Sequence, residues 1–94
     1  PQMPKNNKPK SAISIRQPYA EQILQGTKTK EFRSVPTHKR ERVYVYASLT
    51  PNTPDAESMT RGKLIGTIEI TDCIPDKRTG GFAYKLANPQ RLAR

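Results

Sequence analysis

Residues 12–33 read AISIRQPYAEQILQGTKTKEFR. Over residues 12–16 the isoleucines alternate with polar residues, which is the two-residue period of a half-buried strand. Pro18 suits the first turn of a helix, and the apolar residues that follow it recur on one helical stripe. Gly26 stands where a left-handed residue commonly ends a helix. The stretch therefore predicts a strand, a two-turn helix over residues 18–25 that must pack on a sheet, and a charged strand after a short turn.

Three later segments also alternate in the manner of strands. Residues 42–48 read RVYVYAS, with small apolar side chains on one face and two tyrosines on the other. Residues 63–74 read KLIGTIEITDCI, in which Gly66 indicates a bulge or bend. The last predicted strand, residues 82–86, is expected to end at Asn88-Pro89. With a basic loop over 34–41, a loop over 49–61 containing one helical turn, and a turn over 75–81, the chain predicts an α+β fold with a curled sheet or small barrel.

Length and charge limit the possible functions. Ninety-four residues make one domain, and residues 1–10 (PQMPKNNKPK) are expected to be a flexible basic tail ahead of a domain over 11–94. No apolar run is long enough for a transmembrane helix or a secretory signal, so we expect an intracellular, cytoplasmic protein. Seventeen Lys and Arg against eight Asp and Glu give a net charge of +9, which favours a polyanionic partner, nucleic acid first. A solvated basic face without a partner is the alternative.

Metal and disulfide chemistry are not expected. The single cysteine, Cys73, has no partner for an internal disulfide, and with the single His38 it does not supply the four ligands of a Cys-based zinc site. We expect Cys73 to be a small core or half-exposed residue. No cofactor is predicted, and the oligomeric state stays open.

The densest group of chemically useful side chains follows Gly26. Alternation along a strand sends Thr29, Glu31 and Arg33 to one face and Lys30 and Phe32 to the other. If Glu31 and Arg33 face inward, each needs the other or a ligand, because unpaired buried charge is costly. The segment is therefore either a solvated strand face with weak ion pairs or a polar pocket for an anion or a base.

Four segments together resemble the ASCH (activating-signal-cointegrator homology) domain, a family of the PUA-like superfamily. They are the I-x-x-G-x-K-T-x-E-x-R segment with its preceding SIRQPYA, the RVYVYAS strand, the G-x-I-E-I strand and FAYKL, and they span residues 12–88. The resemblance implies a small PUA-like β-barrel of about five to six strands with one short helix packed on it. It also implies that RNA or a nucleotide binds in a cleft lined by the G-x-K-x-x-E-x-R segment.

The resemblance assigns ligand-binding roles to particular residues. Lys28 and Arg33 would hold a phosphate or a carbonyl oxygen. Glu31 and Glu69 would accept from exocyclic amino groups or hold the cations in place when the site is empty. Tyrosines would stack an unpaired base, although core filling is the alternative for Tyr19. The full ligand-binding set is Lys28, Thr29, Glu31, Arg33, Glu69, Arg16, Gln17 and Tyr19, with Tyr44 and Tyr46 as further stacking candidates and Lys39, Arg40 and Arg42, beside His38, as phosphate-backbone contacts.

Catalysis is a second possibility that the resemblance raises. Small members of the family include amidohydrolases acting on N4-acetylcytidine, which use a Thr nucleophile, a Lys and a Glu, and this makes Lys28, Thr29 and Glu69 the catalytic candidates. Glu31, however, occupies the position of the nucleophilic Thr, and a carboxylate does not replace an activated hydroxyl. We therefore expect a binding module, with a hydrolase on a modified nucleoside, a ribonuclease, or an interaction module for an acidic protein as alternatives.

Overall fold

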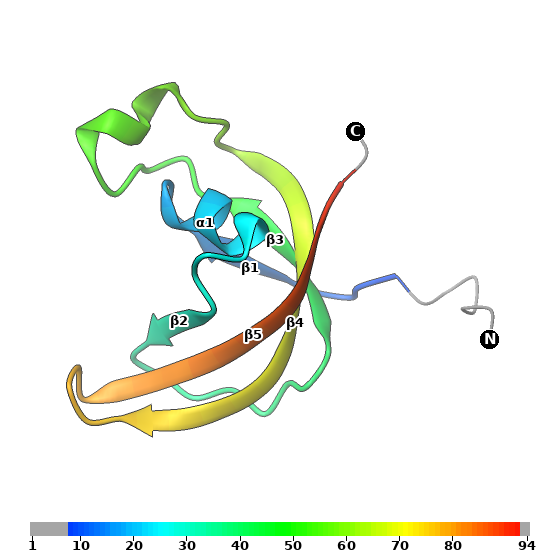
Figure 1. Ribbon diagram of the computed structural model, residues 1–94, viewed down its shortest axis with the longest axis vertical. Coiled ribbons are helices and arrows are strands. Elements are labelled where there is room, and N and C mark those ends of the chain that lie inside the picture. Colours follow the sequence, from blue (N-terminus) through cyan, green and yellow to red (C-terminus); the bar gives the residue numbers. More distant parts are fainter. Residues whose placement is uncertain (1–7, 93–94) are drawn as a thin grey trace.

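The computed structural model describes residues 8–92 and shows a curled five-stranded sheet with one α-helix on it (Figure 1). Its elements in chain order are β1 (Ala12–Ile15), α1 (Tyr19–Gln25), β2 (Lys30–Arg33), β3 (Arg42–Ala47), the 3-10 helix η1 (Pro54–Ser58), β4 (Lys63–Asp76) and β5 (Gly81–Arg91). The predicted α+β fold with a curled, barrel-like sheet and one packed helix is confirmed. Of the tail predicted over residues 1–10, residues 1–7 lie outside the described part of the chain.

The strand order of the sheet leaves two edges that face each other. The order is β1-β3-β4-β5-β2, with β1 parallel to β3 and every other pair antiparallel. β1 and β2 are therefore the two edge strands of a half-barrel, and we call the gap between them the seam. In residues 8–92 no helix has the length and apolar character needed to cross a bilayer.

The helix α1 closes the concave side of the sheet. Ala20, Ile23 and Leu24 are buried in one core with the inward residues of β3, β4 and β5, as the predicted apolar stripe requires. Tyr19 is not part of this core, because 37% of its surface is exposed. The helix ends at Gly26, whose φ of +84° is the left-handed conformation that glycine adopts without steric cost.

A bulge at Gly66 bends β4 around the helix. Val45 is paired with Gly66, but Tyr46 is paired with Leu64, so the register shifts by one residue there. An added Cβ on Gly66 would lie 2.6 Å from the Leu24 side chain, which shows how closely α1 approaches the strand. The bend predicted from this glycine is confirmed.

The prediction that Asn88-Pro89 ends the last strand is wrong. β5 continues to Arg91, which is paired with Gly66 of β4. The β4–β5 register shifts between Thr67 and Glu69, and Asn88 has a φ of +55°. Asn88 and Pro89 therefore form a bulge in β5, a position at which a proline, which has no N–H, is tolerated within a sheet. β4 likewise runs on through Pro75 to Asp76, and the turn predicted over residues 75–81 is shorter.

Candidate functional site

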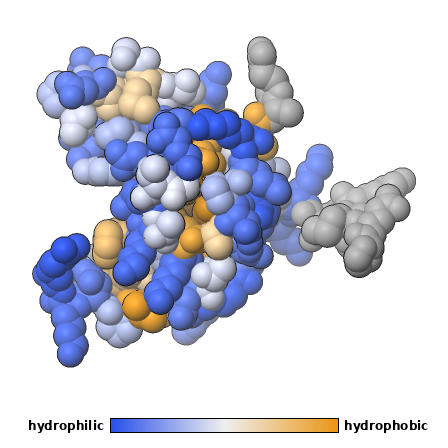
Figure 2. Space-filling model, in the orientation of Figure 1, coloured by the Kyte–Doolittle hydropathy of each residue, from blue (hydrophilic) through white to orange (hydrophobic). Residues whose placement is uncertain are grey.

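A cavity of about 590 Å³ lies at the seam. Residues of β1, β2, the start of α1 and the loop before η1 line it: Ser14, Ile15, Arg16, Tyr19, Lys28, Glu31, Phe32, Arg33 and Asn52. Figure 2 shows the surface hollowed between the part that carries η1 and the part that carries β2 and the β4–β5 turn. We call this space the seam cavity; its volume lies in the range of small-molecule sites.

An ion pair forms the inner wall of the seam cavity. Glu31 and Arg33 occupy alternate positions on β2 and so share one face, as the strand pattern predicted; of the two faces that the pattern left open, theirs is the less exposed one. Arg33 Nε lies 3.1 Å from Glu31 Oε2. The Nη2 group of Arg33 donates to the carbonyl oxygen of Ser14 on β1. The two side chains therefore pair with each other, and Arg33 also links the two edges of the sheet.

The positive charges near Glu31 only partly offset the cost of burying its carboxylate. Its side chain is 14% exposed, and burial raises the pKa of Glu31 above its ordinary value although the charges of Arg33 and Lys28 act in the opposite direction. Desolvation disfavours the charged form, whereas each additional hydrogen bond to that form favours it. A ligand that donates an N–H to Glu31 would thus stabilise the carboxylate.

Two aromatic rings flank a lysine at the mouth of the seam cavity. Lys28 Nζ lies 5.2 Å from the ring centroid of Tyr19 and 5.2 Å from that of Phe32, within the range of cation–π attraction. Asn52 Nδ2 donates to the Tyr19 hydroxyl over 3.1 Å, which fixes the ring. Within residues 8–92 no carboxylate lies within ion-pair distance of Lys28. We call this arrangement of two rings with one ammonium group over them the aromatic clamp.

Three members of the implied ligand-binding set do not line the seam cavity. Gln17 is 1% exposed, and its side-chain amide donates to Thr60 O and accepts from the Glu21 backbone N–H, each over 2.9 Å. It therefore holds the loop before β4 against α1. Thr29 is exposed at the end of the turn before β2, outside the cavity lining. Arg16, by contrast, lines the seam cavity as expected.

Glu69, the third of these residues, lies on the outer face of the sheet. It is paired with Arg42 on one side and Ala87 on the other, and it accepts a hydrogen bond of 2.7 Å from Asn88 Nδ2. β2 pairs with β5 only as far as Lys85, so no β2 residue reaches the row of Glu69. The expected convergence of Glu69 with the β2 side chains is therefore not found.

The loop cations are largely engaged by the protein itself. Lys39 lies 3.7 Å from Glu41 and Arg40 lies 3.6 Å from Asp72, both in exposed pairs. Arg42 donates to Thr67 Oγ1 over 2.8 Å and to the Asn88 carbonyl over 2.9 Å, which stabilises the bulge in β5. Through these contacts Arg42 has a structural role in the sheet. His38 is exposed in the same loop, and Tyr44 and Tyr46 lie on β3 away from the seam cavity.

Sequence reasoning did not single out Asn52 or Ser14. Asn52 reaches the site because its backbone N–H donates to the Gln17 carbonyl over 2.8 Å, a contact between segments far apart in the chain. Ser14 contributes its carbonyl group, which any residue type possesses. No residue type or spacing in the sequence marks either position.

The catalytic candidates do not share one cavity. Of Lys28, Thr29 and Glu69, only Lys28 lines the seam cavity. Cys73 is half-buried against the core, as expected. In the described part of the chain, no three His, Cys, Asp or Glu side chains are grouped to hold a metal ion. The two rings beside Lys28 and the Glu31–Arg33 pair are suited to binding a ligand by stacking, charge and hydrogen bonds.

The fold and this cavity define a small half-barrel with a ligand site between its edge strands. The ASCH domain model matches residues 13–87, which is most of the chain, and the protein belongs to the ASCH domain family. A search of the curated proteins finds no significant match.

Proposed function

We propose that the protein is an RNA- or nucleotide-binding module and that the seam cavity holds one unpaired nucleotide. The observation that carries this proposal is the aromatic clamp beside the Glu31–Arg33 pair. Membership of the ASCH family and the net charge of +9 support the same class of ligand. Proteins that recognise single-stranded RNA commonly stack splayed bases on aromatic rings and read their edges with polar side chains.

Each part of the seam cavity has a role in this proposal. The base stacks on Tyr19 or Phe32, whose faces are sequence-tolerant platforms. The ammonium of Lys28, which has no ion-pair partner in residues 8–92, meets the phosphate, and Arg16 stands at the same rim. The Glu31–Arg33 pair presents an acceptor beside a donor and so fits a base edge that carries an amino group next to a ring acceptor.

The test is a substitution that removes one stacking face. Tyr19→Ala should weaken binding of a short single-stranded RNA by about 5- to 150-fold, because base stacking on an aromatic side chain contributes about 1–3 kcal/mol. Tyr19→Phe keeps the ring and should bind within a few fold of wild type. Tyr44→Ala is the matched control, since that tyrosine lies on β3 outside the seam cavity.

The binding assay is NMR shift perturbation with a panel of nucleosides, nucleotides and short RNAs. The proposal requires shifts at the cavity residues and their loss in Tyr19→Ala. Equal affinities for Tyr19→Ala and Tyr44→Ala would overturn it. An acidic polypeptide that competes better than RNA of equal charge would instead show a protein partner.

A further inference from the structure

A basic surface, distinct from the seam cavity, lies on the side of β2 that faces away from the Glu31–Arg33 pair. Lys30 of β2 and Lys85 of β5 are directly opposite each other in the antiparallel register, and both are exposed. Directly opposed like charges destabilise a sheet. Neither lysine has an ion-pair partner within residues 8–92, and the nearby Asp72, opposite Lys85 on β4, is paired with Arg40. A side-chain hydrogen bond from Thr79, together with the charges of Arg78 and Lys30, lowers the pKa of Asp76. Two carboxylates, Asp72 and Asp76, therefore partly offset the positive charge here. The positive charge that remains exposed on Lys30 and Lys85 is what a polyanion would meet.

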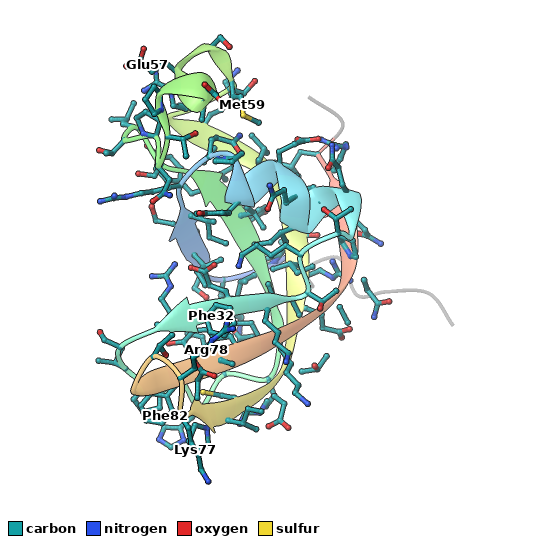
Figure 3. The ribbon with its side chains drawn as sticks, turned by 60° about the vertical axis from the view of Figure 1, so that its left-hand side comes forward. Phe32, Glu57, Met59, Lys77, Arg78 and Phe82 are labelled. Carbon is teal, nitrogen blue, oxygen red and sulfur yellow. The ribbon has the colours of Figure 1, made fainter. Side chains whose placement is uncertain are left out.

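Phe32 connects this lysine pair with the seam cavity and with the β4–β5 turn. It occupies the same outer face two positions after Lys30, is 36% exposed and lines the seam cavity. It also lines a smaller cavity of about 280 Å³ with residues 79–81 of the turn. Figure 3 shows Phe32 at the same end of the molecule as Lys77 and Arg78, with Glu57 and Met59 at the other end.

We propose that this lysine face, made of Lys30, Lys85, Lys77 and Arg78, binds the phosphates of the single-stranded RNA that adjoins the nucleotide in the seam cavity. The inference rests on the proposed function and extends it from one nucleotide to a strand. Phe32 lines the seam cavity and lies on the same face of β2 as Lys30, so a strand leaving the cavity would pass over an aromatic ring onto the lysines.

The extent of the face fits a strand better than a single nucleotide. Lys85 lies four positions along β5 from Gly81 at the turn, which is about 13 Å at the rise of an extended chain. A duplex fits poorly, because the stacking faces of its bases are covered and the aromatic clamp needs one that is exposed. The partner is therefore RNA with an unpaired segment.

The experiment measures affinity against salt for two ligands, an eight-nucleotide single-stranded RNA and a nucleoside monophosphate. Each phosphate contact in a single strand contributes about 0.7 to the slope of log K against log salt. Lys85→Gln should lower the slope for the RNA by about 0.7 and weaken binding by about 5-fold at 0.1 M salt, and Lys30→Gln/Lys85→Gln by about 1.4 and about 25-fold. The monophosphate affinity should not change in either variant.

Two controls separate this role from bulk charge and from misfolding. Lys63→Gln removes the same charge from an exposed position at the start of β4, outside both cavities, and should leave the RNA slope unchanged. The Tm of Lys85→Gln should stay close to that of wild type, because the substitution removes both the repulsion from Lys30 and the attraction to Asp72, which lies across from Lys85.

Four results would overturn the inference. Equal effects of Lys85→Gln and Lys63→Gln would show a non-specific dependence on net charge. If Lys85→Gln lowered the affinity for the RNA and for the monophosphate equally, Lys85 would contact the nucleotide in the seam cavity and not the adjoining strand. RNA binding that responds to Lys85→Gln but not to Tyr19→Ala would refute the seam-cavity proposal. It would also refute the idea that one RNA strand runs from the seam cavity onto the lysine face. In contrast, a response to Tyr19→Ala with none to Lys85→Gln would refute the lysine face alone.

Discussion

Replacing Lys28 by methionine separates the ligand-binding role of this side chain from its structural one. Met keeps an unbranched apolar side chain between the two rings but removes the ammonium group. Two cation–π contacts at a partly exposed site contribute about 0.5–1 kcal/mol each, and methionine retains part of this through sulfur–aromatic contact. The expected loss of unfolding free energy is therefore about 1 kcal/mol or less, which lowers the Tm by about 4–8 °C at most for a domain of this size.

The expected loss of binding is larger. A hydrogen bond from a charged donor contributes about 1.5–3 kcal/mol, so Lys28→Met should weaken binding of a nucleoside monophosphate by about 10- to 150-fold. Lys28→Arg keeps the charge and should recover most of the affinity. Removing the ammonium should also raise the pKa of Glu31 further, because the Lys28 charge lowers it in the wild type.

Calorimetric titration gives the affinity, thermal unfolding gives the stability, and carboxyl NMR gives the Glu31 pKa in the same three proteins. A fall in stability well above 2 kcal/mol, together with unchanged nucleotide affinity, would refute the reasoning. It would show that Lys28 holds the helix and β2 together instead of meeting the ligand.

Two further perturbations test the site and the fold. Burial raises the pKa of Glu31 in the folded protein, so its contribution to stability is present below the unfolded pKa and is lost as pH rises through the folded value. In urea unfolding, wild type should accordingly lose stability relative to Glu31→Gln as the pH rises from well below the ordinary carboxyl pKa to neutral; the opposite trend would contradict the pKa direction. Gly66→Ala places a Cβ 2.6 Å from the Leu24 side chain and 2.5 Å from the Gln90 carbonyl oxygen, and should cost about 1–3 kcal/mol, because the backbone oxygen cannot move aside. An unchanged Tm for that variant would show that β4 has room to shift.

The local features of the fold could be predicted from the sequence because each rests on near neighbours. The helix end at Gly26 follows from a glycine in a left-handed conformation, and the bend at Gly66 follows from a glycine inside an alternating strand. Alternation along β2 also placed Glu31 and Arg33 on one common face, where they pair, although it left open whether that face points inward. The continuation of β5 past Pro89 was not predictable in this way, because it depends on how the bulge registers against β4.

Prediction of the candidate site from the sequence succeeded and failed for the same reason as prediction of the fold: only features set by near neighbours could be found. Lys28, Glu31 and Arg33 were found because they follow one another on one short segment. Tyr19 was ambiguous, because its place on the helical stripe fits a core residue, whereas it faces the seam cavity. Glu69 was misplaced, because its distance from β2 depends on the sheet order and on where β2 ends, neither of which follows from the alternation of β4.

The central claim is that the seam cavity between β1 and β2 holds a nucleotide. An NMR titration of the full chain with a short single-stranded RNA tests it most directly, with backbone amide shifts as the readout. If the nucleotide occupies the seam cavity, the largest shifts fall at residues 14–16, 19, 28, 31–33 and 52, which border the cavity. Saturable binding with shifts confined to other residues, for example η1 and the outer face of β3, would contradict it.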